Sequence, residues 1–261
     1  MTHDQPKVFD ISLPRHGTVS MQNALHQLGF NTAHLGHIIG SHIGSSGHSD
    51  PARLKQMYEQ IKQGDYKLDI LNECDGLGDY PICAPQVFKE IAKQYPDAKF
   101  IHVKRRDVSK WLQSVEVQFV GSQFANFFKG TQSDEEFTAL MQNFREMTFG
   151  QKEFDPTAYT QAMHRHYDQV KEVFADQPDR LLEFDDISEF NAEGFSRLAK
   201  FLGKPDPQRE FPLNNTHSSN PQKAFIRAVE QGLYTPKSAI DIDELKKMVA
   251  KQDAKAAAAG V

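Results

Sequence analysis

The residues around Arg15 have the types and spacing that bind an oxyanion. An apolar run over 8–13 ends in Pro-Arg-His-Gly-Thr, and an amphipathic helical pattern begins at Thr18. A helix N-terminus presents free backbone N–H groups and a partial positive charge, and Gly17 lets the backbone approach a ligand closely. Thr18 and Ser20 add hydroxyl donors, and Arg15 adds a rigid fork of N–H donors. The sequence therefore predicts an anion-binding loop, and the alternative is a tight strand–helix turn capped by Thr18.

This loop lacks the pattern of a nucleoside triphosphatase. Such a loop has the form G-x-x-x-x-G-K-[ST], in which the lysine contacts the outer phosphates and the hydroxyl binds magnesium. Here the cation Arg15 precedes the glycine, and no lysine follows Gly17 directly. A kinase-like phosphotransferase with a P-loop is therefore a disfavoured alternative, and we expect no metal ion.

Alternating strands and helices must position this loop. Apolar and β-branched runs predict strands over 8–13, 68–77, 98–105 and 179–185. Helical patterns cover 18–28, 51–64, 84–96, 107–119, most of 122–176, and 192–203. Irregular loops are expected over 31–51 and 204–235, the second with one short helix.

This order of elements predicts an α/β fold with a mostly parallel central sheet covered by helices on both faces, as in P-loop-like proteins. We expect one domain over 1–261, with a core over about 7–235 and a helical tail over 236–261. Ligands of such sheets bind at the carboxyl ends of the strands. The segments "LPRHGT" (13–18) and "VKRRD" (103–107) both follow strand ends, so we expect them to meet there.

Composition narrows the class of ligand and the cellular setting. A net charge of −5 gives no global electrostatic case for nucleic acid or a membrane surface, so an anion site must be local. No apolar run approaches the roughly 18 residues that a spanning helix needs. Two cysteines without a C-x-x-C spacing favour a reducing, cytoplasmic setting. A homodimer is left open.

Two motifs together resemble a known family. "PRHGTVS" (14–20) resembles the 5′-phosphosulfate loop of sulfotransferases that use PAPS (3′-phosphoadenylyl sulfate), and "RRDVSKWLQS" (105–114) resembles their 3′-phosphate motif, with Arg106 and Ser114 eight positions apart. The run from "DYP" (79–81) through "YPDAKF" (95–100) is similar to one bacterial and eukaryotic branch. "PDRLLEFD" (178–185), "LAKFLGKPDP" (198–207) and "FPLNN" (211–215) then follow in that branch's order.

The resemblance implies a sulfotransferase fold over about residues 7–227 and a donor site for PAPS, with PAP (adenosine 3′,5′-bisphosphate) as the product. The 5′-phosphosulfate would be held by the loop residues Arg15, His16, Gly17, Thr18, Val19 and Ser20. Arg106 and Ser114 would hold the 3′-phosphate, while Arg15 would stabilise the leaving phosphate and Ser114 would connect the two phosphates. Phe225 and Arg227 in "AFIRAVEQG" (224–232) resemble a further donor motif, Phe225 for the adenine and Arg227 for the 3′-phosphate. The alternative for that segment is an ordinary amphipathic helix.

A base must take the proton of the attacking acceptor hydroxyl. In the small-molecule branch a histidine occupies this place, and here the corresponding residue is Asp79, whose alternative role is to cap the helix after Pro81. His16 is a second catalytic candidate, with a solvent- or substrate-facing role as its alternative. The histidines of the Gly/Ser-rich loop match no closed metal site and are interpreted as substrate-lining, with His34 or His37 nearest the strand end; they are His34, His37, His42 and His48.

The predicted activity is the transfer of a sulfuryl group to a hydroxyl, or to an amine, of a small-molecule or glycan acceptor. Segments 34–50 and 119–165 are expected to form the acceptor pocket. Their aromatic residues are candidates for an apolar wall or for core: Phe119, Phe124, Phe127 and Phe128. A non-catalytic nucleotide- or anion-binding module of the same fold is the competing function.

Overall fold

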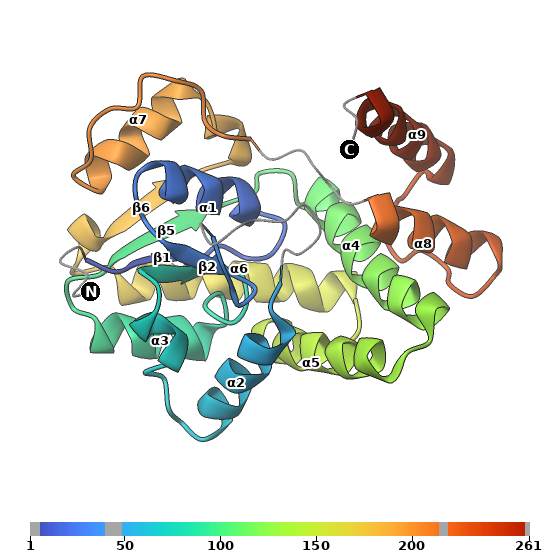
Figure 1. Cartoon of the computed structure of the whole chain (residues 1–261), viewed down its shortest axis with the longest axis horizontal. Helices are drawn as coiled ribbons and strands as arrows, with labels where there is room; N and C mark the ends of the chain where they lie inside the picture. Colours follow the sequence, from blue (N-terminus) through green and yellow to red (C-terminus); the bar gives the residue numbers. More distant parts are fainter. Residues whose placement is uncertain (1–5, 40–48, 214–218, 259–261) are drawn as a thin grey trace. The chain divides into compact units, whose positions relative to one another are not determined.

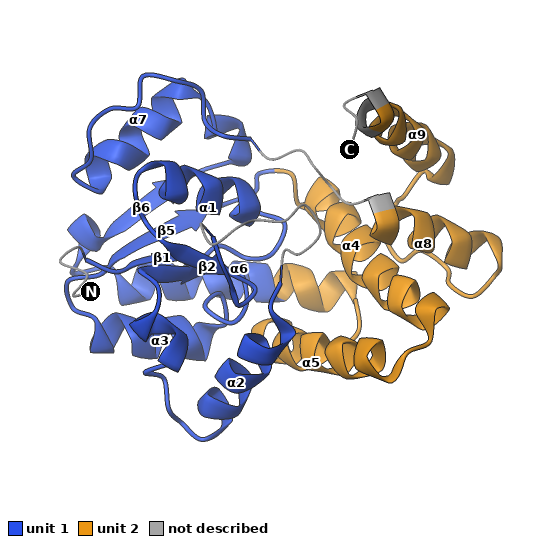
Figure 2. Cartoon of the chain, in the orientation of Figure 1, with its two compact units in different colours: residues 1–106, 162–214 blue, residues 107–161, 215–261 orange. Residues whose placement is uncertain are grey.

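The structure is a computed structural model that describes residues 6–39, 49–213 and 219–258 (Figure 1). It divides into two compact units, which are described separately. Unit 1 comprises residues 1–106 and 162–214, and unit 2 comprises residues 107–161 and 215–261 (Figure 2). No helix among the described residues is both long enough and apolar enough to cross a bilayer.

A six-stranded sheet forms the centre of unit 1 within the described residues. The strands are β1 (Val8–Asp10), β2 (Thr32–His34), β3 (His37–Ile38), β4 (Gly76–Gly78), β5 (Lys99–Val103) and β6 (Leu181–Phe184). Their order is β3-β2-β4-β1-β5-β6, and every neighbouring pair is parallel except β2 with β3. The predicted mostly parallel α/β sheet is therefore confirmed.

Helices cover the sheet, and their apolar residues form its core. The helices of unit 1 are α1 (Thr18–Gln27), α2 (Pro51–Lys62), α3 (Pro85–Gln94), α7 (Ala192–Phe201) and the larger part of α6 (Pro156–Val173). Residues of α1 and α7 pack with Val8, Ile101 and Val103 in one buried cluster. Side chains alternate along a strand, so Phe9 and Phe100 point to the face opposite to that of Val8 and Ile101. On that face, the ring centroid of Phe100 lies 4.8 Å from that of Phe174.

Unit 2 is helical in its described part. It contains α4 (Val108–Lys129), α5 (Gln132–Phe149), the start of α6, α8 (Ser219–Glu230) and α9 (Ile242–Ala258). Gly121 of α4 lies so close to α8 that a Cβ atom there would be 2.1 Å from the carbonyl oxygen of Pro221. Phe149 stacks on Tyr159 at 4.1 Å and also contacts Trp111. Aromatic packing therefore holds α4, α5 and the start of α6 together.

The prediction of an irregular loop over 31–51 is wrong for strands β2 and β3. The Gly/Ser/His-rich segment 31–51 was expected to be irregular, but residues 32–34 pair with β4 and turn back at Leu35 and Gly36 to form β3. The described residues also include three 3₁₀ helices, over Asp69–Asn72, Pro178–Arg180 and Ile187–Glu189. The first lies inside the strand predicted over 68–77, where the observed strand β4 begins only at Gly76.

Candidate functional site: an anion loop and a Thr18–Asp79–His34 cluster

The turn between β1 and α1 has a backbone shape that exposes donors. Arg15 and Gly17 both have positive φ, at 69° and 81°. Gly17 is the N-cap of α1, and no described side chain caps the helix or places a carboxylate in its first turn. The first N–H groups of a helix have no intrahelical partner, so this N-terminus suits an anion. Val19 and Ser20 continue the same first turn.

Thr18 does not cap the helix as the alternative interpretation required. Its hydroxyl donates to Oδ2 of Asp79 at 2.9 Å, and its Oγ1 lies 3.1 Å from Nε2 of His34. His34 Nε2 is itself 3.5 Å from the same carboxylate oxygen. These three side chains, called the Thr18–Asp79–His34 cluster below, come from α1, the turn after β4 and the end of β2. All three are buried in unit 1.

Asp79 does not cap the following helix either. Helix α3 begins at Pro85 after Ala84, and no described side chain caps it. Asp79 has a φ of 63°, in the left-handed region, and its Oδ1 accepts the N–H of Tyr80 at 2.9 Å. Burial raises the pKa of the Asp79 carboxyl, but hydrogen bonds from His34, Thr18 and Tyr80 outweigh this and lower it overall. Asp79 is therefore a carboxylate held within the cluster.

Three arginines belong to the same part of unit 1. The guanidinium of Arg105 donates to the backbone carbonyl of Arg15 at 3.4 Å. Burial lowers the pKa of Arg15, Asp79 opposes this, and the nearby charge of Arg105 lowers it further. Arg106 is exposed, and its backbone N–H donates to Asp186 at 3.2 Å. Two cations that repel each other beside a helix N-terminus would be stabilised by a bound anion.

His16 is part of the core of unit 1. Its side chain is fully buried, its Nδ1 lies 2.7 Å from the carbonyl oxygen of Val103, and its ring lies edge-on to Tyr167. Burial lowers the pKa of His16 to about 3, so the ring is neutral at physiological pH. The solvent-facing alternative is therefore wrong. The ring positions the anion loop by tying it to β5.

Asp10 is a site residue that the sequence interpretation missed. It ends β1, pairs in register with Gly78 just before Asp79, and is fully buried. Its Oδ1 accepts the N–H of Ser12 at 3.1 Å, whereas its Oδ2 has no partner among the described residues. Burial raises the pKa of Asp10 to about 7, against the lowering effect of hydrogen bonds from Ser12. Its position as a charged residue inside the apolar run 8–13 could have identified Asp10 from the sequence.

The remaining histidines differ in where they lie. His34 belongs to the cluster, and His37 faces it in register across the β2–β3 pair. His42 and His48 lie outside the described residues. His166 is buried against Phe88. Among the described residues no group of three or more His, Cys, Asp or Glu side chains could hold a metal ion.

Unit 2 contains the other residues predicted for the donor. Ser114 lies on α4 and is half-buried. Phe225 on α8 is fully buried with its ring 5.8 Å from that of Tyr234, and the guanidinium of Arg227 lies 3.9 Å from the ring centroid of Phe128. Phe225 therefore packs as on an ordinary amphipathic helix, and its contact with the adenine stays a prediction.

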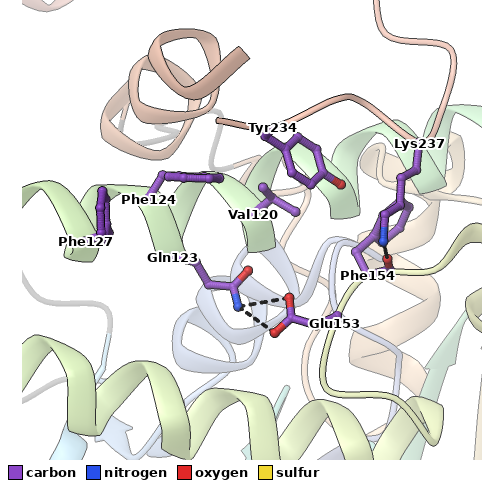
Figure 3. A pocket seen from close by; sticks show the side chains of 8 residues that line it. All are labelled: Val120, Gln123, Phe124, Phe127, Glu153, Phe154, Tyr234 and Lys237. Carbon is purple, nitrogen blue, oxygen red and sulfur yellow. Dashed lines mark hydrogen bonds between the residues drawn. The ribbon is translucent and has the colours of Figure 1, made fainter. Parts of the chain in front are cut away.

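A pocket of about 270 Å³ lies within unit 2 (Figure 3). Phe124 and Phe127 from α4 line it, as predicted for an apolar wall, whereas Phe119 is buried in the core. Gln123 and Glu153 also line the pocket, and the Glu153 carboxylate oxygens accept from the Gln123 amide at 3.4 and 3.5 Å. Tyr234 and Lys237 complete the opposite side, where Lys237 donates to the Phe154 carbonyl at 2.8 Å.

Comparisons with known proteins give one family. A family model described as "Sulfotransferase domain" matches residues 7–220. Among solved structures, a sulfotransferase from Alicyclobacillus acidocaldarius is similar over 87% of this chain and 92% of that chain, with 14% identity and a TM-score of 0.46. No curated protein matched.

Proposed function

The chain belongs to the sulfotransferase domain family, and from that premise we propose that it transfers a sulfuryl group from PAPS to an acceptor hydroxyl, or to an amine, and releases PAP. The observation that carries the proposal is the loop between β1 and α1. It combines a helix N-terminus that no described side chain caps with positive φ at Gly17 and at the cation Arg15. The cations Arg105 and Arg106 follow β5, which is the parallel neighbour of β1.

The residues of unit 1 fit the two anionic ends of such a donor. We assign the 5′-phosphosulfate to Arg15 and to the backbone N–H groups of residues 17–20, because a helix N-terminus and a guanidinium both bind oxyanions. Arg106 is assigned to the 3′-phosphate, which its exposed side chain is free to approach. From the resemblance alone, Ser114 and Arg227 of unit 2 are proposed as further donor contacts. The single-domain organisation stays a prediction.

Charge stabilisation and positioning are the chemistry that these residues supply. The donor, when bound, brings a sulfuryl group on a phosphate leaving group. The bond from sulfur to the phosphate oxygen breaks as the bond to the acceptor oxygen forms, and negative charge grows on the phosphate. Arg15 and the α1 N–H groups stabilise that charge. The acceptor proton passes to the Thr18–Asp79–His34 cluster, which includes the predicted base Asp79.

The acceptor, the assembly and the cellular location stay as predictions. Our proposed acceptor class is a small molecule or a glycan, because the fold alone does not define the substrate. A homodimer and a cytoplasmic setting are also proposed from the sequence. Neither nucleic acid nor a membrane is proposed as a partner.

Ligand-dependent thermal unfolding tests the donor assignment. We expect PAP at about 100 times its Kd to raise Tm by about 5–10 °C, and ATP with or without magnesium to leave Tm unchanged. Arg106→Ala should weaken PAP binding about 10- to 100-fold, because it removes a charged hydrogen-bond donor. The matched control is Arg165→Ala, an exposed arginine on α6, which should bind PAP like the wild type. A PAP shift that survives Arg106→Ala unchanged would remove Arg106 from the site.

Two competing functions predict other results. Stabilisation by ATP and magnesium but not by PAP would favour a kinase-like phosphotransferase. A non-catalytic module would bind PAP and show no PAPS turnover. In the enzyme, Asp79→Ala should lower slow PAPS turnover while PAP binding persists.

A further inference from the structure

We propose that His34 is the residue that takes the proton of the acceptor hydroxyl, and that Thr18 and Asp79 hold its ring for that step. This inference rests on the proposed sulfuryl transfer and assigns roles within the same site. Proton transfer by a positioned imidazole is the commonest form of general base catalysis in enzymes.

The contacts of Asp79 indicate that it orients the ring of His34. Its Oδ1 accepts from Tyr80 N–H at 2.9 Å, and its Oδ2 accepts from the Thr18 hydroxyl at 2.9 Å with His34 Nε2 a further 3.5 Å away. Both oxygens are therefore engaged by the protein. The left-handed φ of 63° at Asp79 is an unfavourable conformation for a residue with a side chain, which the surrounding contacts must maintain. A carboxylate held in this way beside an imidazole fixes the ring and stabilises its protonated form.

The hydroxyl of Thr18 determines which nitrogen of His34 is available. A threonine hydroxyl has one proton, and here it is donated to Asp79. The 3.1 Å contact between Thr18 Oγ1 and His34 Nε2 must then be a hydrogen bond from Nε2–H to the hydroxyl oxygen. A neutral imidazole that carries its proton on Nε2 has its lone pair on Nδ1. The structure thereby assigns Nδ1 as the basic atom, with no hydrogen bond to it from the described residues.

The position of His34 suits a residue that meets the acceptor. It is the last residue of β2, at the same carboxyl edge of the sheet as the anion loop. It is 7% exposed, so it is shielded but not sealed from the surface. The charged or titratable groups near His34 are Asp79 and Asp10, with Arg15 beside Asp79 and His37 across the β-pair. Asp79 is the nearest of them and has the sign that favours an imidazolium.

The proton balance of the step is complete without another reactant. The acceptor O–H bond breaks, its proton goes to Nδ1 of His34, and its electrons remain on the oxygen that bonds to sulfur. The sulfur–phosphate oxygen bond breaks, and its electron pair leaves with PAP. The imidazolium, paired through Nε2–H with Thr18 and Asp79, then releases its proton to water.

His34→Gln tests the assignment while preserving a donor. A glutamine amide can still donate to Thr18 but cannot accept a proton, so we expect kcat to fall about 100-fold or more. The PAP-induced rise in Tm should be the same as in the wild type. The control is His164→Gln, an exposed histidine of α6, which should retain wild-type kcat. His34→Gln with more than half of the wild-type kcat would overturn the proposal.

The pH profile and the ring tautomer provide readouts that a merely structural role would not change. Wild-type kcat/KM should rise with pH through one ionisation. In Asp79→Asn, kcat should fall while the PAP-induced rise in Tm persists, because the ring loses the carboxylate that orients it. Long-range proton–nitrogen NMR of the resting enzyme should show His34 protonated at Nε2. A proton on Nδ1 alone would contradict the assigned basic atom. Failure of PAP to bind the wild type would overturn the donor proposal instead, which separates the two.

Discussion

Asp10→Asn should remove the contribution that one buried carboxyl makes to the pH dependence of stability. The Asp10 carboxyl is fully buried, and its pKa is raised from 3.8 to about 7 chiefly by that burial. The change is about 3 pH units, which corresponds to about 4 kcal/mol at 1.36 kcal/mol per unit. Asparagine has nearly the same shape, and its carbonyl can still accept the Ser12 N–H. The substitution therefore removes the charge and keeps the hydrogen bond.

The direction in which stability changes with pH follows from proton binding to Asp10. Between pH 3.8 and 7 the native state holds a proton on Asp10 that the unfolded state has lost. The free energy of unfolding of the wild type therefore falls as pH rises through this window, and the stabilisation is lost above pH 7. The buried histidines have the opposite slope in both proteins, so they cancel in the difference. The stability of Asp10→Asn minus that of the wild type should increase by about 4 kcal/mol between pH 4 and pH 8.

Urea unfolding followed by circular dichroism at several pH values measures this difference. Asp176→Asn, at an exposed position, should give a difference that does not vary with pH. A difference for Asp10→Asn that stays constant within about 1 kcal/mol across the range would refute the reasoning. Asp10 would then be ionised in the native protein at neutral pH.

Three further predictions concern stability. Gly17→Ala should lower the free energy of unfolding by more than Gly29→Ala does. Both residues have positive φ, but only at Gly17 would the new Cβ lie 2.5 Å from a Phe190 ring atom. Urea unfolding measures the loss of stability in each variant, and equal losses would contradict the predicted clash. Glu116→Gln should lower stability by about 2–4 kcal/mol, since the buried carboxylate accepts hydrogen bonds on both oxygens. His16→Gln should flatten the loss of stability on acidification between pH 6.5 and 3, because the wild-type ring is neutral when folded and protonated when unfolded; an unchanged acid slope would count against this.

The layout of the sheet could be predicted from local patterns. Buried parallel strands are mostly apolar and alternate with amphipathic helices, so β1, β5 and β6 were recognisable from the sequence. Strands β2 and β3 have only three and two residues, in a segment rich in glycine and histidine. Runs that short have no measurable period, and they form because β4 offers a partner edge.

The interior of the candidate site could be predicted only in part. Capping a helix was the alternative role for both Thr18 and Asp79, because capping is a local role that a local pattern suggests. In the structure they bond to each other across 61 positions of sequence. Such a contact depends on the register of β1 with β4, where Asp10 lies opposite Gly78. His34 likewise joins the cluster because β2 pairs with β4, and neither pairing is encoded in a local pattern.

The formation of PAP from sulfur-labelled PAPS is the measurement that tests the central claim most directly. Purified protein with a panel of small-molecule and glycan hydroxyl acceptors should release PAP and label at least one acceptor, and Arg15→Ala should abolish both signals. A protein that binds PAP tightly yet forms neither PAP nor a labelled product with any acceptor would contradict the account.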